Sequence, residues 1–235
     1  MERIEDAFNY SRLNNRGVEI SRGSLVALLN NDVEVINDDW LSEMVSHAMR
    51  PEVAMVGARL WYPNGTIQHA GVIVGAGGIA GHAHVGLRRN EPGLLCSRAS
   101  NAQDLSAVTA ACAVVKREVY LQLGGFDENL AVAFNDVDFC LRLRKAGYRI
   151  VWTPHAELIH HESASRGVDD STPKQIRFLS EIDYMNSKWA SRIATRSILQ
   201  PQPLAQRRSL HPRFPAAHDQ TVAESRRLIH ALLKD

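Results

Sequence analysis

The sequence lacks the features that would place a chain across a membrane. No window reaches the roughly 18 apolar residues that a membrane-spanning helix needs. The longest mainly apolar stretch, Ala107–Val115, suits a buried strand better. The opening residues, Met-Glu-Arg-Ile-Glu-Asp, are charged and have no apolar core, so they do not form a secretory signal.

Cysteine is also scarce. The three cysteines, Cys96, Cys112 and Cys140, form no Cys-x-x-Cys pair and no metal-binding spacing, and their number is odd. Buried reduced thiols in a cytoplasmic protein are the better interpretation. The formal net charge of +1 gives no sign of a nucleic-acid binder, which is usually strongly basic. A Gly-rich phosphate loop with a lysine is absent, which weakens a reading as a nucleotidyltransferase-like protein.

What is present is an alternation of apolar strands and amphipathic helices. The chain has 235 residues and 45% hydrophobic content, enough for one ordinary domain. In the first half the alternation predicts an α/β fold with a mainly parallel sheet flanked by helices. We expect this domain to span residues 1–190. A basic linker and a C-terminal helix, Thr221–Lys234, would occupy residues 191–235. The expected elements are helices at 12–22, 38–49, 117–123, 135–146 and 172–189, strands at 25–29, 53–60, 67–74, 106–116, 149–152 and 156–160, and a glycine-rich loop at 71–89.

A polar turn follows the first apolar strand. Leu25–Leu29 ends abruptly in Asn30, Asn31 and Asp32. Ligands of open α/β sheets lie at the carboxyl ends of strands, and an acidic residue there can reach Mg²⁺ or Mn²⁺. The alternative is a solvated turn, because Asn and Asp are good turn formers.

Two carboxylates open a predicted helix. Asp136 and Asp138 stand two residues apart, and an ionised Asp136 in the first helical turn is a candidate general base. Asp138 and Arg142 are spaced to pair on one helix face. Helix capping and a surface ion pair would explain the same pattern.

Two further features can bind a ligand. His160 lies at the end of an apolar strand and can offer an imidazole to a metal, although a lone histidine is more often a satisfied polar group. Trp61 stands beside a polar loop, where an aromatic ring can stack on a sugar. Aromatic residues that fill the core beneath a hairpin are an equally good interpretation.

Taken together, these segments resemble the family 2 glycosyltransferases of the GT-A fold, especially bacterial rhamnosyltransferase-like enzymes. The match covers about residues 8–167, and five motifs occur in the right order. These are the DxD-like Leu-Asn-Asn-Asp-Val-Glu-Val segment at 29–35, Tyr62–Gly71, Thr109–Cys112, Gly124–Glu128 with Asn135–Phe139 and Arg142, and the histidine segment Pro154–His160.

The resemblance implies a role for each matching residue. Asp32 and His160 would hold Mn²⁺ or Mg²⁺, and Asp136 would be the general base of an inverting transfer. The donor would contact Asn30, Asn31, Asp32 and Thr109, and the acceptor would contact Trp61, Asn135, Asp138 and Arg142. Two positions depart from the family pattern: Asn135 replaces the usual Glu, and Asn30 replaces the first Asp of the DxD motif.

The resemblance implies an enzyme of surface polysaccharide biosynthesis that uses a nucleotide-diphosphate sugar and a saccharide or lipid-linked acceptor. The family's first nucleotide-binding strands have no counterpart in residues 1–23, so a partner chain could supply them. The alternative is a truncated, non-catalytic domain that binds a saccharide or a partner. The basic segment Arg192–Arg213 suggests peripheral contact with the inner face of the membrane.

Overall fold

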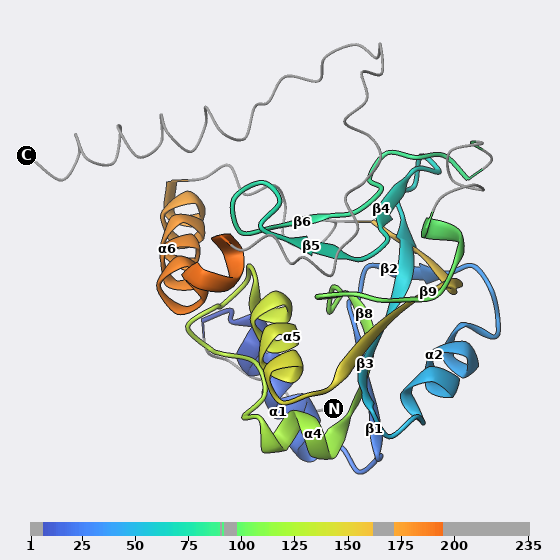
Figure 1. Ribbon diagram of the computed structural model, residues 1–235, viewed down its shortest axis with the longest axis horizontal. Helices are drawn as coiled ribbons and strands as arrows, with labels where there is room; N and C mark the ends of the chain where they lie inside the picture. Colours follow the sequence, from blue (N-terminus) through green and yellow to red (C-terminus); the bar gives the residue numbers. More distant parts are fainter. Residues whose placement is uncertain (1–6, 90, 92–97, 162–171, 195–235) are drawn as a thin grey trace, which may run out of the picture. The chain divides into compact units, whose positions relative to one another are not determined.

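The computed structural model describes residues 7–89, 91, 98–161 and 172–194, all within one compact unit, Met1–Ser197. Figure 1 shows a sheet with helices on both faces. The helices are α1 (Tyr10–Ile20), α2 (Trp40–Ala48), the 3₁₀ turn η1 (Arg98–Ser100), α4 (Arg117–Gln122), α5 (Asn135–Lys145) and α6 (Thr172–Ala194). The strands are β1 (Leu25–Leu29), β2 (Val33–Val35), β3 (Val53–Trp61), β4 (Ile67–His69), β5 (Val72–Val74), β6 (Ala80–His82), β7 (Gln103–Asp104), β8 (Cys112–Lys116) and β9 (Arg149–His160).

The main sheet is mixed, which corrects the expectation of a mainly parallel sheet. Its order is β1-β8-β3-β9-β2, with β4 beside β3 and β7 beside β9. Among the described strands, only β3 and β9 pair in parallel. The strand–helix alternation correctly implies that β1 and β3 run the same way. It carries no information about β8, which inserts between them in the opposite direction.

Strand β3 is the centre of the core, and all of its residues are buried. A strand that is covered on both faces reads as a continuous apolar run. Met44 and Ala48 of α2 pack on one face, against Val56 and Leu60 of β3. The opposite face carries the larger cluster, which includes residues of α1, α4, α5 and α6.

Several boundaries differ from the sequence expectation. The predicted strand 67–74 is split into β4 and β5 at Gly71, whose φ of +97° is outside the strand region. The expected loop 71–89 contains the hairpin β5–β6. Two short predicted strands merge into the single strand β9, which crosses the sheet beside β3. The start of the predicted strand 106–116 is irregular, and β8 begins at Cys112.

The two cysteines among the described residues are buried free thiols, as the sequence predicted. Cys112 and Cys140 are free and buried, and burial raises the pKa of Cys112 to about 12. Cys96 and the predicted helix Thr221–Lys234 lie outside the described residues. Within the described part of the chain, no helix is both long and apolar enough to span a membrane.

Candidate active site

The polar turn after β1 and the end of β9 come together at one edge of the sheet. The backbone N–H of His161 donates to the carbonyl of Asp32 at 2.9 Å, and β2 pairs antiparallel with the end of β9. This pairing carries Asp32 to His160, with 3.1 Å between Asp32 Oδ1 and His160 Nε2. Asn31 is exposed in the same turn. The structure therefore joins two residues that are 128 positions apart in the sequence.

A chain of hydrogen bonds surrounds the imidazole ring of His160. Burial, followed by the charge of Asp136, raises the pKa of Tyr10, so its hydroxyl stays protonated. That hydroxyl lies 3.0 Å from Asn30 Oδ1, which turns Asn30 Nδ2 toward His160 Nε2 at 3.2 Å. On the other side of the ring, His160 Nδ1 lies 2.7 Å from Gln68 Oε1. When a neutral His160 donates from Nδ1 to Gln68, its Nε2 is left as an acceptor.

Two electron-rich atoms therefore face each other. Asp32 Oδ1 is buried and accepts no hydrogen bond from the residues that the structure describes, yet it lies 3.1 Å from the acceptor nitrogen of His160. Two ligands at right angles around Mg²⁺, each at about 2.1 Å, would be about 3.0 Å apart. An oxygen and an imidazole nitrogen thus fit a divalent cation. Among the described residues, no group of three or more His, Cys, Asp or Glu side chains is placed to hold a metal ion.

Asp136 lies at the start of α5, in the first turn, where the sequence placed it. Its Oδ1 accepts the N–H of Val137 at 2.7 Å, and its Oδ2 accepts the N–H of Ala110 at 3.1 Å. The side chain is half-buried and lines a cavity of about 190 Å³. Two backbone N–H groups thus hold this carboxyl group in place at the start of α5. Such a group is suited to accepting a proton.

Tyr10 connects the two carboxylate sites. Its hydroxyl lies 3.1 Å from the carbonyl of Ala110, whose own N–H holds Asp136, and 3.0 Å from Asn30. Thr109 stands one residue earlier, half-buried, and its Oγ1 accepts the N–H of Ala111 at 3.3 Å. Ala110, the Tyr10 hydroxyl and Asn30 thus connect the Asp136 site to the turn that carries Asp32.

The residues expected to contact an acceptor are placed differently. The side chains of Trp61, Asn135 and Asp138 are at most 2% exposed, and each is bonded to protein groups. Trp61 donates to Glu157, and Asn135 donates to the carbonyl of Val132 at 3.0 Å. For Trp61 this is the core packing that the sequence left open as an alternative, whereas the ion pair of Asp138 is buried and not on the surface.

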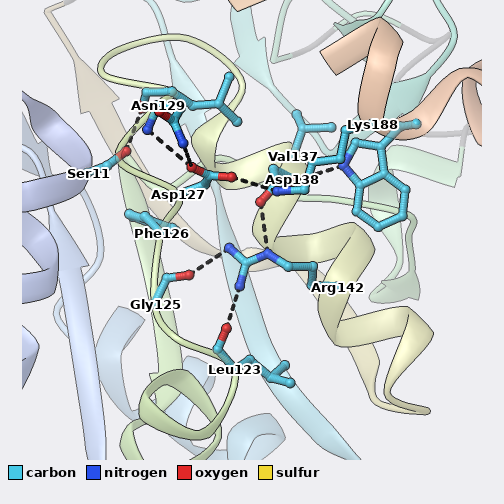
Figure 2. A network of polar contacts seen from close by, with 12 residues as sticks. Ser11, Leu123, Gly125, Phe126, Asp127, Asn129, Val137, Asp138, Arg142 and Lys188 are labelled. Carbon is cyan, nitrogen blue, oxygen red and sulfur yellow. Dashed lines mark hydrogen bonds and ion pairs between the residues drawn. The ribbon is translucent and has the colours of Figure 1, made fainter. Parts of the chain in front are cut away.

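Asp138 and Arg142 belong instead to a buried polar network (Figure 2). Asp138 accepts hydrogen bonds from Arg142 Nε at 2.8 Å and from Trp189 Nε1 at 2.8 Å, and it lies 2.9 Å from Lys188 Nζ. Arg142 also donates to the carbonyls of Leu123 and Gly125. The network ties α6 to α5 and to the Gly124–Gly125 turn, so its role is to support the site.

Lys188 extends this network to a second carboxylate. It donates to Asp127 Oδ2 at 2.6 Å, and Tyr184 donates to the same oxygen at 2.7 Å. Burial raises the pKa of Asp127, but the hydrogen bonds from Lys188 and Tyr184 outweigh burial and hold that pKa well below its usual range. Lys188 of α6 therefore pairs with one carboxylate from each of two segments, Asp127 of Gly-Gly-Phe-Asp-Glu and Asp138 of Asn-Asp-Val-Asp.

Helix α6 also holds the loop in front of Asp136. Glu181 is 1% exposed and accepts the N–H groups of Val132 at 2.8 Å and Ala133 at 3.2 Å. Phe178 stacks on Phe134, with ring centroids 5.6 Å apart. Phe134 has a φ of +62°, a conformation that costs energy for a residue other than glycine. Contacts from α6 thus stabilise the strained residue that precedes α5.

Sequence reasoning missed two positions of the candidate site. Gln68, which contacts His160 Nδ1, lies in the 62–71 segment, so the resemblance singled out its region without giving it a role. Tyr10 carried no sequence signal, because the predicted helix began two residues after it. A helical tyrosine has no pattern that reveals a partner 100 residues away.

Comparisons with known proteins agree with this geometry. A sequence profile described as glycosyl transferase family group 2 matches residues 25–212. The chain belongs to this family, as the motifs suggested. The computed structure also resembles the crystal structure of GalNAc-T7 with UDP, GalNAc and Mn²⁺, with a TM-score of 0.60, 13% identity, and coverage of 82% of this chain and 37% of that one. The expected GT-A-like α/β architecture is thereby confirmed.

Two relatives are more similar in sequence. The chain is 57% identical over 183 residues to uncharacterized protein y4gI of Sinorhizobium fredii, and 43% identical over 195 residues to O-antigen biosynthesis protein RfbC of Myxococcus xanthus. These matches cover 77% and 83% of this chain. The chain spans only 20% and 14% of the length of those two relatives.

Proposed function

We propose that this chain carries the acceptor-activating part of an inverting glycosyltransferase. The acceptor hydroxyl gives its proton to Asp136, and its oxygen forms a bond to the anomeric carbon of the donor. The bond from that carbon to the diphosphate breaks, and the nucleoside diphosphate leaves with the electron pair. A single displacement of this kind inverts the anomeric configuration.

The observation that carries the proposal is the pairing of Asp32 Oδ1 with the acceptor nitrogen of His160 at 3.1 Å. This pair supports binding of Mn²⁺ or Mg²⁺, which when bound would neutralise the charge that develops on the diphosphate. Gln68 and Asn30 orient the imidazole, and Tyr10 orients Asn30. We assign Asn31 and Thr109 to the donor side, as the family resemblance implies. GalNAc-T7 was solved with Mn²⁺ and UDP, which supports the same assignment.

The name of the RfbC relative supports a place in surface polysaccharide biosynthesis, with a nucleotide-diphosphate sugar as donor and a saccharide or lipid-linked acceptor. Such a protein would work in the cytoplasm or at the inner face of the membrane. Among the described strands, β1 pairs with β8 alone, which leaves its other edge for a strand from a partner chain or a further segment.

The first test is metal-dependent nucleotide binding. In calorimetry with UDP, GDP and dTDP, we expect at least one nucleotide to bind in the presence of Mn²⁺. Asp32→Asn or EDTA should weaken that binding by about 10–100-fold, because a charge-assisted contact is lost. Glu34→Gln is the matched control, since the Glu34 side chain lies in the next strand and is 65% exposed.

The possible results separate the two functional readings. Binding that is equal with and without EDTA, or unchanged by Asp32→Asn, would remove the metal site from the proposal. A chain that binds no nucleotide in this assay, but does bind saccharides in a separate titration, would support the alternative, a non-catalytic saccharide- or partner-binding domain.

Gln68 gives a second test of the same site. Gln68→Ala removes the acceptor that holds the proton on His160 Nδ1, so we expect a loss of about 10–100-fold in Mn²⁺ affinity. Gln122→Ala, at the end of α4 and exposed, is the control. Titration of Mn²⁺ by electron paramagnetic resonance measures the affinity. Equal affinities for the two variants would mean that Gln68 does not orient a metal ligand.

A further inference from the structure

Helix α6 carries a buried carboxylate that is bonded to the loop in front of α5. Glu181 Oε1 accepts the N–H of Val132, and its Oε2 accepts the N–H of Ala133. Arg177 Nε lies 3.6 Å from the same Oε2. Burying a carboxylate is costly unless it is hydrogen-bonded, and here two successive peptide groups provide the bonds. Glu181 therefore fixes the orientation of the peptide groups that join Ala131 to Val132 and Val132 to Ala133.

Two other helices hold carbonyl groups of the same loop. The backbone N–H of Tyr10, at the start of α1, donates to the carbonyl of Ala131 at 2.7 Å. The side chain of Asn135, at the start of α5, donates to the carbonyl of Val132 at 3.0 Å. Tyr10 and Asn135 thus bond to carbonyl oxygens, whereas Glu181 bonds to N–H groups, so neither of them can replace its contacts.

Phe134 joins this loop to the first turn of α5. Its φ of +62° is a strained conformation, which persists only where the surroundings impose it. The carbonyl of Phe134 accepts the N–H of Asp138 at 2.8 Å, which closes the first turn around Asp136. Val132, Phe134 and Asp136 line the same cavity. A rotation of the peptide groups in the loop would therefore move the Asp136 carboxylate relative to the cavity that it lines.

We propose that Glu181 is a positioning residue, which keeps the candidate base Asp136 in its reactive place by fixing the peptide groups of Val132 and Ala133. It acts through Phe134 and the first turn of α5, without touching the substrate. This inference rests on the proposed function and adds a residue on which the rate of transfer depends. A general base must lie within hydrogen-bond reach of the proton it takes, and a misplacement of about 1 Å can cost about 100-fold in rate.

The test replaces Glu181 by glutamine in the whole chain. Glutamine has nearly the same size, but an NH₂ group stands in place of one oxygen and cannot accept a backbone N–H. We expect kcat for transfer to fall about 10–100-fold. The donor KM and the Mn²⁺-dependent nucleotide affinity should not change, because the Asp32–His160 pair belongs to the turn after β1 and to β9. The control for lost stability alone is Val53→Ala, a fully buried residue in the core cluster that packs with α2, which should lower the unfolding temperature and leave kcat unchanged.

A second measurement does not depend on turnover. In NMR spectra of isotope-labelled protein, Glu181→Gln should shift the backbone amides of Ala110 and Val137, since both donate to the Asp136 carboxylate. Val53→Ala should leave these two amides in place. Glu181→Asp, which keeps the charge but withdraws it from the loop, should shift the same amides and serves as the test if the glutamine variant does not fold.

The positioning role is ruled out if the amides of Ala110 and Val137 keep their wild-type shifts, or if kcat of Glu181→Gln equals that of the wild type. An equal fall in kcat in Val53→Ala would assign the effect to stability and overturn the proposal as well. If the wild-type chain shows no transfer, the proposed function fails. The amide shifts then still decide whether Glu181 positions Asp136.

Discussion

Replacing Asp136 by asparagine is expected to lower kcat for glycosyl transfer by about 10²–10⁴-fold, the usual contribution of a general base. The amide cannot take the acceptor proton. Binding of the nucleoside diphosphate should be retained, because the Asp32–His160 pair that we assign to the donor does not include Asp136. The measurement is release of nucleoside diphosphate from a panel of nucleotide sugars with lipid-linked and free saccharide acceptors.

Two controls separate catalysis from folding. Asp38→Asn makes the same chemical change at an exposed position and should leave kcat unchanged. Thermal unfolding of Asp136→Asn should stay close to that of the wild type, since Asn can still accept one of the two backbone N–H groups that hold the native carboxylate. Turnover near the wild-type rate would exclude Asp136 as the base.

Replacing Asp138 by asparagine should instead cost stability, about 3–5 kcal/mol in the free energy of unfolding. Asp138 is fully buried and faces Arg142, Lys188 and Trp189. The change removes the buried charge that Arg142 and Lys188 face, and breaking a buried ion pair from one side is more costly than losing the pair as a whole. Urea unfolding, extrapolated linearly to water, gives the value. Amide hydrogen exchange in α6 should accelerate, because this network ties α6 to α5.

The matched control is Asp104→Asn. Asp104 also pairs with an arginine at 2.8 Å, but in that pair with Arg149 the side chains are 44% and 46% exposed. A surface ion pair contributes about 0–1 kcal/mol, so this variant should lose far less stability than Asp138→Asn. If the two variants lost equal amounts of unfolding free energy, the burial of Asp138 would not be what makes its ion pairs stabilising. If Asp138→Asn lost transfer activity without losing stability, Asp138 would have to be counted among the residues that contact the substrate.

The candidate site was partly predictable because its chemistry lies where elements begin and end. Asp32 follows an apolar strand and Asp136 opens an amphipathic helix, and both signals are local in sequence. His160 was identified for the same reason, as a polar residue that ends an apolar strand. The roles expected for Trp61, Asn135 and Asp138 depended on exposure, and exposure depends on what packs above them. Helix α6, which covers Asp138, could be predicted as a helix but not assigned a place.

The sequence by itself determined the family and most of the helix and strand segments, and it singled out Asp32, Asp136 and His160 as candidate site residues. Hydrophobic periodicity and helix capping act over a few residues, so each helix or strand can be recognised from its own stretch of sequence. The tertiary structure decided the direction of β8, the contact of Asp32 with His160 and the cavity shared by Asp136 and His82. Each of these depends on contacts between residues far apart in the sequence, such as Asn30 with His160 and Tyr10 with Ala110. Local spacing carries no record of such contacts, because packing of the whole chain selects them.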